Sequence, residues 1–247
     1  MSLKSLLWRN MKWRYHYRVT VFVTIIQPLI WLLLYSTVVS GADRVAYTSF
    51  ILPGIMILVM LGACSSSGMM NYMTKNEGSF QRLLRAPVSR TSIISAQNLE
   101  AVVLSFIEIF LLMIISLGLS VRFQLSVSGG LLAILILFLT GFFMANVAYS
   151  ISLKLPNEII YETVMNMIVL PLFFASTALL PLENISDGIR WLVLLNPFTH
   201  VIEALRRLLN GQSLPLKNTL FLIILLVVLC IMGLLFSKHM LKKESSK

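Results

Sequence analysis

The chain has 247 residues, of which 57% are hydrophobic and only 12% are charged, and its formal net charge is +10. Because soluble domains carry about 25% charged residues, this composition excludes a water-soluble globular protein. The basic residues lie between long apolar runs, which disfavours nucleic acid as a partner and favours anionic lipid headgroups. Cys64 and Cys230 lie inside apolar runs without CxxC spacing, so we expect packing residues rather than a disulfide or a zinc site.

The first 17 residues predict an amphipathic helix that lies in the cytoplasmic headgroup layer. Leu3, Leu7, Met11 and Tyr15 recur at helical spacing, and the basic residues fall mostly on other faces. An irregular basic tail is the alternative, which this regular spacing disfavours. The apolar run that follows, Val19–Val39, is longer than the core of about 7 to 15 residues in a signal peptide, so we expect a retained membrane span.

Six apolar stretches are long enough to cross a bilayer, for which a helix needs about 20 mostly apolar residues. They are Val19–Val39, Phe50–Tyr72, Leu99–Val121, Leu131–Leu153, Ile159–Leu180 and Leu220–Phe236. The prediction is therefore an all-α, polytopic membrane protein in which residues 1–247 form a single membrane domain.

The placement of Lys and Arg predicts the orientation, because basic residues are retained on the cytoplasmic side of a membrane. With the N-terminus inside, 14 of the 20 Lys and Arg residues fall in cytoplasmic segments and 6 in outer segments. The outer six are Arg44, Arg122, Arg190, Arg206, Arg207 and Lys217. Both termini are therefore expected in the cytoplasm.

The stretch Ile189–Leu209 is apolar enough to suggest a seventh span, but a crossing would place the lysine-rich C-terminus outside. We therefore expect two short re-entrant helices that dip into the outer leaflet between the fifth and sixth spans. Asn196 as N-cap and Pro197 in the first turn would begin the second helix, and Gly211 would end it.

The longest cytoplasmic loop, residues 73–92, contains a short amphipathic segment. Ser79 is expected to cap a helix in which Phe80, Leu83 and Leu84 form an apolar stripe before the proline at position 87. The stripe either docks on a partner or lies on the membrane surface, and periodicity alone favours neither.

Four stretches resemble type-2 ABC transporter permeases, in the same order along the chain. EGSFQRLLRAPVSR at 77–90 resembles the loop whose short coupling helix docks on an ATPase subunit. FILPGIM at 50–56, PLFFASTALLPLENI at 171–185 and NPFTHVIEALR at 196–206 are similar to the second span, the end of the fifth span and the outer segment. The resemblance covers essentially the whole chain and is closest to permeases of the daunorubicin-resistance and nodulation-factor export type.

This resemblance implies an exporter permease in a bacterial cytoplasmic membrane, acting as a homodimer with two copies of a cytoplasmic ABC ATPase. Its cargo would be an amphiphilic or hydrophobic substrate such as a drug, an antibiotic, a lipid or a lipo-oligosaccharide. ATP and Mg would bind to the partner ATPase, because this chain has no GxxxxGK[ST] phosphate loop. We expect no cofactor, metal or catalytic residue here, since HExxH and GxSxG are also absent and the three histidines are scattered.

Three sets of candidate functional residues follow. The resemblance assigns ATPase coupling to Glu77, Phe80, Arg82, Leu83, Leu84 and Arg85. It places an outer gate at Asn196, Pro197, Glu203 and Arg206, where Glu203 can pair with Arg206 or Arg207 at helical spacing. Glu108, Asn146 and Asn166 are candidates for the substrate cavity, because an acid inside a span is kept only where it is paired or functional. Glu108 is alternatively a protonated structural acid that joins helices by hydrogen bonds.

Two other functions compete with this interpretation. An ion-gradient-driven secondary transporter would favour intramembrane acids and interrupted repeats, and we find no convincing internal repeat. A membrane-embedded enzyme would need a polar constellation at the membrane face, whereas Glu100, Glu108 and Glu162 lack the pattern of metal ligands or of a nucleophile.

Overall fold

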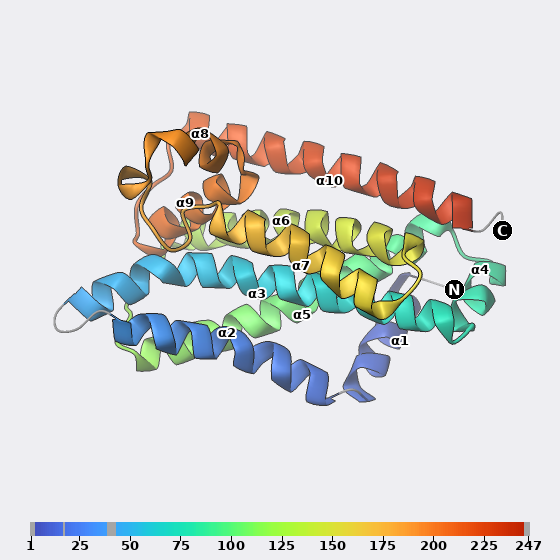
Figure 1. Cartoon of the computed structure of the whole chain (residues 1–247). Helices are drawn as coiled ribbons and strands as arrows, with labels where there is room; N and C mark the ends of the chain where they lie inside the picture. The colour runs from blue at the N-terminus through green and yellow to red at the C-terminus, as the bar shows by residue number, and fades with distance from the viewer. Residues whose placement is uncertain (1–2, 17, 39–42, 245–247) are drawn as a thin grey trace.

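The computed structural model of the chain describes residues 3–16, 18–38 and 43–244, and these parts contain helices and no strands. The long helices extend between the same two ends of the molecule (Figure 1). In chain order the elements are α1 (Leu3–His16), α2 (Arg18–Val38), α3 (Asp43–Asn76), α4 (Ser79–Arg85), α5 (Arg90–Gly118), α6 (Val127–Lys154), α7 (Glu158–Phe174), η1 (Leu182–Asn184), α8 (Asp187–Leu195), α9 (Pro197–Leu209) and α10 (Leu216–Glu244).

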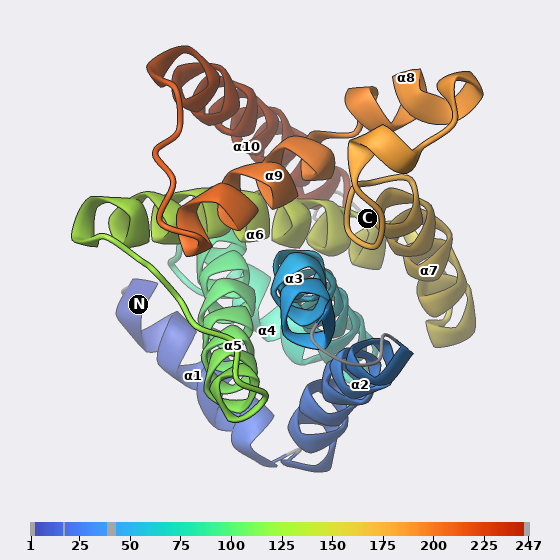
Figure 2. The ribbon, with the colours of Figure 1, turned by 90° about the vertical axis from the view of Figure 1, so that its left-hand side faces the viewer.

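Helix α3 forms the centre of the bundle, between α2, α5, α6 and α7 (Figure 2). Its most apolar 18-residue window is 61% buried, whereas the corresponding window of α10 is only 17% buried. Close approach to α6 depends on Gly68, because a Cβ there would lie 2.9 Å from the carbonyl oxygen of Ala148. The core of the fold therefore surrounds α3, and α10 presents most of its apolar surface outward.

Four helices among the described residues are long and apolar enough to cross a membrane, namely Val45–Asn76, Arg90–Gly118, Val127–Lys154 and Leu216–Glu244. They correspond to the second, third, fourth and sixth predicted spans. Each continues as helix beyond its apolar stretch. The Ser89 and Ser126 side chains cap the starts of α5 and α6 by accepting hydrogen bonds from backbone N–H groups. The prediction of an all-α, multi-pass membrane protein is confirmed at this level.

The first predicted span lies partly outside the described residues. Val39 and the side chains of residues 18–25 are not described, and within the remainder Ile26–Thr37 forms a shorter apolar helix. Residues 1, 2 and 17 of the predicted N-terminal helix are likewise outside the description. The number of spans therefore stays a prediction.

Helix α7 is shorter than the fifth predicted span, because it ends at Phe174 rather than Leu180. Its 17 residues extend about 26 Å at 1.5 Å per residue. The Asn196 amide caps this end by donating hydrogen bonds to the carbonyl oxygens of Leu172 and Ala175, at 2.6 and 2.8 Å. A side chain distant in sequence thus decides where the helix stops.

Helices α8 and α9 lie at the end of the bundle opposite α4 (Figure 1). With 9 and 13 residues they extend about 14 and 20 Å, less than the hydrocarbon core of about 30 Å. As predicted, Asn196 caps α9, Pro197 is its first residue, and Gly211 follows its end with a φ of 73°. The chain leaves α7 and enters α10 at this same end.

Helix α1 lies where the sequence predicts a helix, but it packs on the bundle through another face than the predicted apolar stripe, and its place in the headgroup layer stays a prediction. Leu6 is 1% exposed, and Asn10 and Arg14, one and two turns later, also face the bundle, whereas Leu3 is 40% exposed. Burial of the 6–10–14 face leaves the predicted apolar stripe half exposed at its described positions. Helix α1, α4 and the C-terminal end of α10 lie at one end of the molecule (Figure 1).

Candidate functional site

The short helix α4 forms one candidate site, at the end of the bundle that carries α1. Its N-cap is Gly78, which adopts a left-handed φ of 75°, and not Ser79 as predicted. The Ser79 hydroxyl instead donates to the carbonyl oxygen of Thr74, at 3.0 Å. A residue without a Cβ suits this reversal of the chain between α3 and α4.

Phe80 and Leu83, which the prediction placed in an ATPase contact, face the interior of this chain. Phe80 is 1% exposed and Leu83 6% exposed. Phe80 packs in a cluster with Ile94, Tyr149, Leu153 and Leu241, while Leu83 packs in another with Leu6, Ile93 and Ala96. The two side chains therefore anchor α4 to α10 and α1.

The outer surface of α4 is polar and cationic. Gln81, Arg82 and Arg85 are exposed, and Leu84 is half-buried. Glu77, just before the helix, is also exposed. Of the six predicted coupling residues, four thus remain accessible to a partner, and the two that supply most of the apolar stripe do not.

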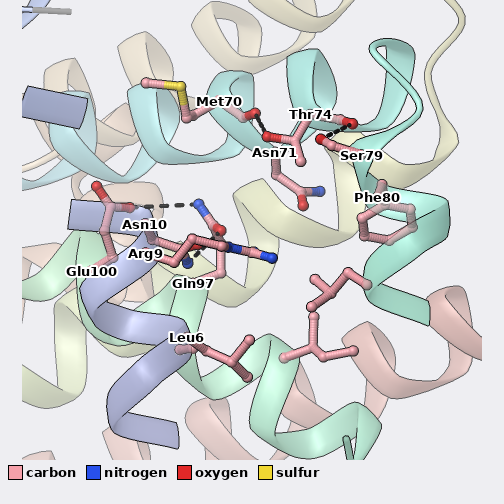
Figure 3. A pocket seen from close by; sticks show the side chains of 13 residues that line it. Leu6, Arg9, Asn10, Met70, Asn71, Thr74, Ser79, Phe80, Gln97 and Glu100 are labelled. Atoms are coloured by element: carbon pink, nitrogen blue, oxygen red, sulfur yellow. Dashed lines mark hydrogen bonds between the residues drawn. The ribbon is translucent and has the colours of Figure 1, made fainter. Parts of the chain in front are cut away.

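A cavity of about 160 Å³ lies directly behind α4 (Figure 3). Leu6, Phe80 and Leu83 form part of its apolar wall, and side chains from α1, α3, α4 and α5 form its polar wall. The polar wall comprises Arg9, Asn10, Asn71, Thr74, Ser79, Gln97 and Glu100. Burial lowers the pKa of Arg9 below its ordinary value. Its guanidinium donates to the Asn10 side chain at 3.1 Å.

A buried ion pair between Arg14 and Glu100 joins α1 to α5. The Arg14 guanidinium also donates to Ser66 of α3 at 3.0 Å, and the Glu100 carboxylate accepts from Ser67 at 2.5 Å. Gln97 donates to the Ser67 hydroxyl at 2.9 Å and accepts from Asn10. Three helices are thus joined by one polar network, which sequence reasoning missed because Arg14 is separated from Glu100 by 86 positions.

A second hollow, of about 450 Å³, opens between α2, α3 and α7. Its wall includes Gln27, Ser65, Ser66, Glu162 and Asn166 among apolar side chains. Glu162 and Asn166 are exposed and lie one turn apart on α7. These polar groups therefore lie among apolar side chains where α2, α3 and α7 face one another.

The three predicted substrate-cavity residues lie in three different surroundings. Glu108 is 2% exposed on α5. Asn146 is fully buried, and its side chain accepts a hydrogen bond from Ser237 of α10 at 3.1 Å. Asn166 alone of the three lines the lateral hollow between α2, α3 and α7.

At the opposite end of the molecule, the other three stretches of the resemblance meet one another. Arg206 donates to the carbonyl oxygens of Phe50 and Thr177, at 3.1 and 2.7 Å, and its guanidinium lies 3.7 Å from the Phe50 ring centroid. Glu203 accepts from Arg206 at 2.6 Å. Burial lowers the pKa of Arg206, and the Glu203 carboxylate opposes this shift.

Two further contacts complete this junction. Gly54 lies against Ala178, such that a Cβ on the glycine would be 2.8 Å from the alanine Cα. Asn196, whose amide caps α7, also accepts from the backbone N–H of Phe198. We call the contacts of Phe50, Gly54, Thr177, Asn196 and Arg206 the outer junction.

Comparison with known proteins gives these sites a context. The ABC-2 type transporter family matches residues 1–210. The chain is 30% identical over 246 residues to ycf38 of Cyanophora paradoxa, a protein named as a transport permease, covering 91% of this chain and 83% of that protein. It is 29% identical to ycf38 of Pyropia yezoensis, covering 98% and 89%.

A further relative comes from a bacterium. The daunorubicin resistance ABC transporter permease protein DrrB1 of Streptomyces coeruleorubidus is 25% identical over 210 residues, covering 84% of this chain and 74% of that protein. The family match spans three of the four membrane-length helices, α3, α5 and α6, and includes both α4 and the outer junction, whereas α10 lies beyond it. The chain therefore belongs to the ABC-2 type transporter family, as a membrane-spanning permease.

Proposed function

We propose that the chain is the permease subunit of an ATP-driven ABC exporter, and that it works as a homodimer with two copies of a separate cytoplasmic ABC ATPase. The observation that carries this proposal is α4, whose inner side is anchored in the bundle while its outer side presents Gln81, Arg82 and Arg85. ATP and Mg would bind to the ATPase chains. Both termini and α4 would face the cytoplasm.

The two anchors of α4 supply a route for movement into the membrane. A displacement of α4 reaches α10 through Phe80 and Leu241, and it reaches α1 through Leu83 and Leu6. From α1 the Arg14–Glu100 pair extends the route to α5, and Ser66 extends it to α3. In this proposal Arg82 and Arg85 steer docking to an acidic surface of the ATPase, and Leu84 supplies the apolar contact.

The test uses the permease co-expressed with the ABC ATPase from its own gene neighbourhood. The double variant Arg82→Glu/Arg85→Glu should insert normally but lose most of the bound ATPase on purification, because like charges at an interface repel. Lys217→Glu reverses a charge at the opposite end of the molecule and serves as the control. Stoichiometric ATPase binding by the double variant would contradict the proposal.

The lateral hollow supports the homodimer and the substrate path. Polar side chains at membrane depth face protein or a watery cavity rather than lipid, and Gln27, Glu162 and Asn166 border a hollow that one copy leaves open. A second copy that covers this face would enclose a path with apolar walls and a few polar groups. Such a path suits an amphiphilic or hydrophobic substrate, a drug, antibiotic, lipid or lipo-oligosaccharide.

The relatives support this choice of substrate class only by their names, since DrrB1 is named for daunorubicin resistance. Membership of the ABC-2 type transporter family does not favour an ion-gradient-driven secondary transporter. The outer junction would act as the outer gate of the proposed path, because Asn196 and Arg206 tie α9 to the ends of α7 and α3.

A further inference from the structure

A small basic hollow of about 210 Å³ lies where α6 and α10 end, on the side of the molecule that carries α4. Leu153 and Lys154 of α6 line it, together with His239, Met240, Lys243 and Glu244 of α10. Two of the six lining residues are lysines and a third is a histidine. The hollow therefore combines positive charge with two apolar side chains.

The acidic member of the hollow is held by a neighbour. The Glu244 carboxylate pairs with the Lys75 ammonium group of α3 at 2.8 Å, and the same ammonium group donates to the carbonyl oxygen of Leu153 at 2.6 Å. Lys75 thus balances Glu244 and joins the ends of α3, α6 and α10. By formal charge, the two lysines that line the hollow and the adjacent Lys75 outnumber its one acidic residue, so the hollow is net positive.

The basic hollow continues into an apolar, outward-facing stripe of α10. Met232 and Phe236 are 60% and 50% exposed. His239 and Lys243 follow at helical spacing on the same face, since positions i, i+4, i+7 and i+11 align along a helix. One face of α10 therefore runs from apolar side chains at membrane depth to cationic side chains at the end of the span.

This sequence of surfaces matches the shape and chemistry of a phospholipid. We propose that the hollow binds the headgroup of an anionic phospholipid in the leaflet on the α4 side, with the phosphate between Lys154 and Lys243 and the acyl chains along Met232 and Phe236. Basic pockets between transmembrane helices recognise anionic headgroups in this way. The lipid would bridge the ends of α6 and α10.

The position of the hollow gives the lipid a second effect. Leu153 lines the hollow and also belongs to the cluster in which Leu241 packs on Phe80 of α4. A bound headgroup would therefore stabilise the anchor of α4 on α10. This second step rests on the proposed coupling role of α4, whereas the binding itself does not.

The experiment measures lipid binding to the purified full-length permease in neutral detergent, with phosphatidylglycerol and phosphatidylcholine as probes and native mass spectrometry as readout. The variant Lys154→Gln/Lys243→Gln should weaken phosphatidylglycerol binding by about tenfold or more, because each lysine near a headgroup contributes appreciably to the attraction. The matched control Lys238→Gln/Lys242→Gln removes the same charge from the same region but outside the hollow, and it should bind like the unaltered chain.

Three results would overturn the proposal. Equal weakening in both double variants would indicate a diffuse basic surface, equal binding of phosphatidylcholine would indicate a purely apolar contact, and equal affinity for glycerol phosphate would indicate a site for a soluble phosphate.

If the glutamine pair reduces folded yield, Lys154→Arg/Lys243→Arg keeps the charge and should retain phosphatidylglycerol binding, and loss of binding in that folded variant would count against the site. The Arg82→Glu/Arg85→Glu variant distinguishes the two proposals. If it loses the ATPase but still binds phosphatidylglycerol, the lipid site stands independently of the proposed function.

Discussion

At the scale of single residues, the Arg14–Glu100 ion pair joins α1 to α5 at the end of the molecule that carries α4. Both side chains are buried, with 4% and 1% of their surface exposed, and the carboxylate also accepts from Ser67. Arg14→Met would leave the Glu100 charge without its counter-ion, which we expect to cost about 3 to 5 kcal/mol of stability. Thermal unfolding in detergent measures this loss.

A double-variant cycle makes the test of this pair specific. Arg14→Met/Glu100→Leu removes both charges and should recover much of the stability lost in Arg14→Met, because apolar replacement of a buried pair is often close to neutral. If Arg14→Met alone unfolds at the same temperature as the unaltered chain, the network does not hold α1 in place.

Glu108 is the second residue with a clear test. Because Glu108 is buried on α5 and does not line the lateral hollow, we predict a structural role for it rather than contact with the substrate. Glu108→Gln should leave transport of a cationic substrate unchanged, whereas Glu108→Leu should lower folded yield, because only the amide preserves the hydrogen bonding. The matched variant Glu162→Gln alters an acid in the hollow and should reduce that transport. Loss of transport in Glu108→Gln, with normal folded yield, would indicate that Glu108 contacts the substrate.

At the scale of elements, two glycines of α3 form a matched pair. A Cβ on Gly54 would meet Ala178 at 2.7 Å, whereas a Cβ on Gly62 would meet nothing within 4 Å. Gly54→Ala should therefore destabilise the fold by about 1 to 3 kcal/mol through overpacking. Gly62→Ala should be neutral or stabilising by up to about 1 kcal/mol, because alanine is the better helix former. Thermal midpoints compare the two, and equal effects would contradict the close contact at the outer junction.

At the scale of the whole molecule, the lateral face between α2, α3 and α7 predicts how two copies meet. Gly62 lines that face and has space for a side chain, so Gly62→Cys should form a disulfide-linked dimer, or one linked by a short bifunctional reagent, in membranes. Gly130→Cys on α6 also has space but does not line the hollow, and it should remain monomeric on denaturing gels. The native cysteines, Cys64 and Cys230, are buried. Equal crosslinking at both introduced positions would contradict this dimer interface.

The amino-acid sequence by itself determined the features that depend on local pattern. Long apolar runs require helices in a bilayer, because lipid leaves no partner for open backbone groups. Asn196, Pro197 and Gly211 delimit α9 by rules that act within a few residues. The four short stretches that resemble type-2 ABC permeases pointed to the family, which the match over residues 1–210 confirms.

Only the tertiary structure decided which face of each helix is buried, because the side chains that contact that face come from parts of the chain distant in sequence. Glu100 turns the 6–10–14 face of α1 inward. Phe80 and Leu83 point into the bundle because α1 and α10 offer apolar partners, although their periodicity is the same as that of a docking stripe. Asn196 ends α7 early for the same reason, since its partners lie more than 20 positions away. The pattern of apolar residues along the chain identifies an apolar helix face, but only the packed fold shows which residues cover that face.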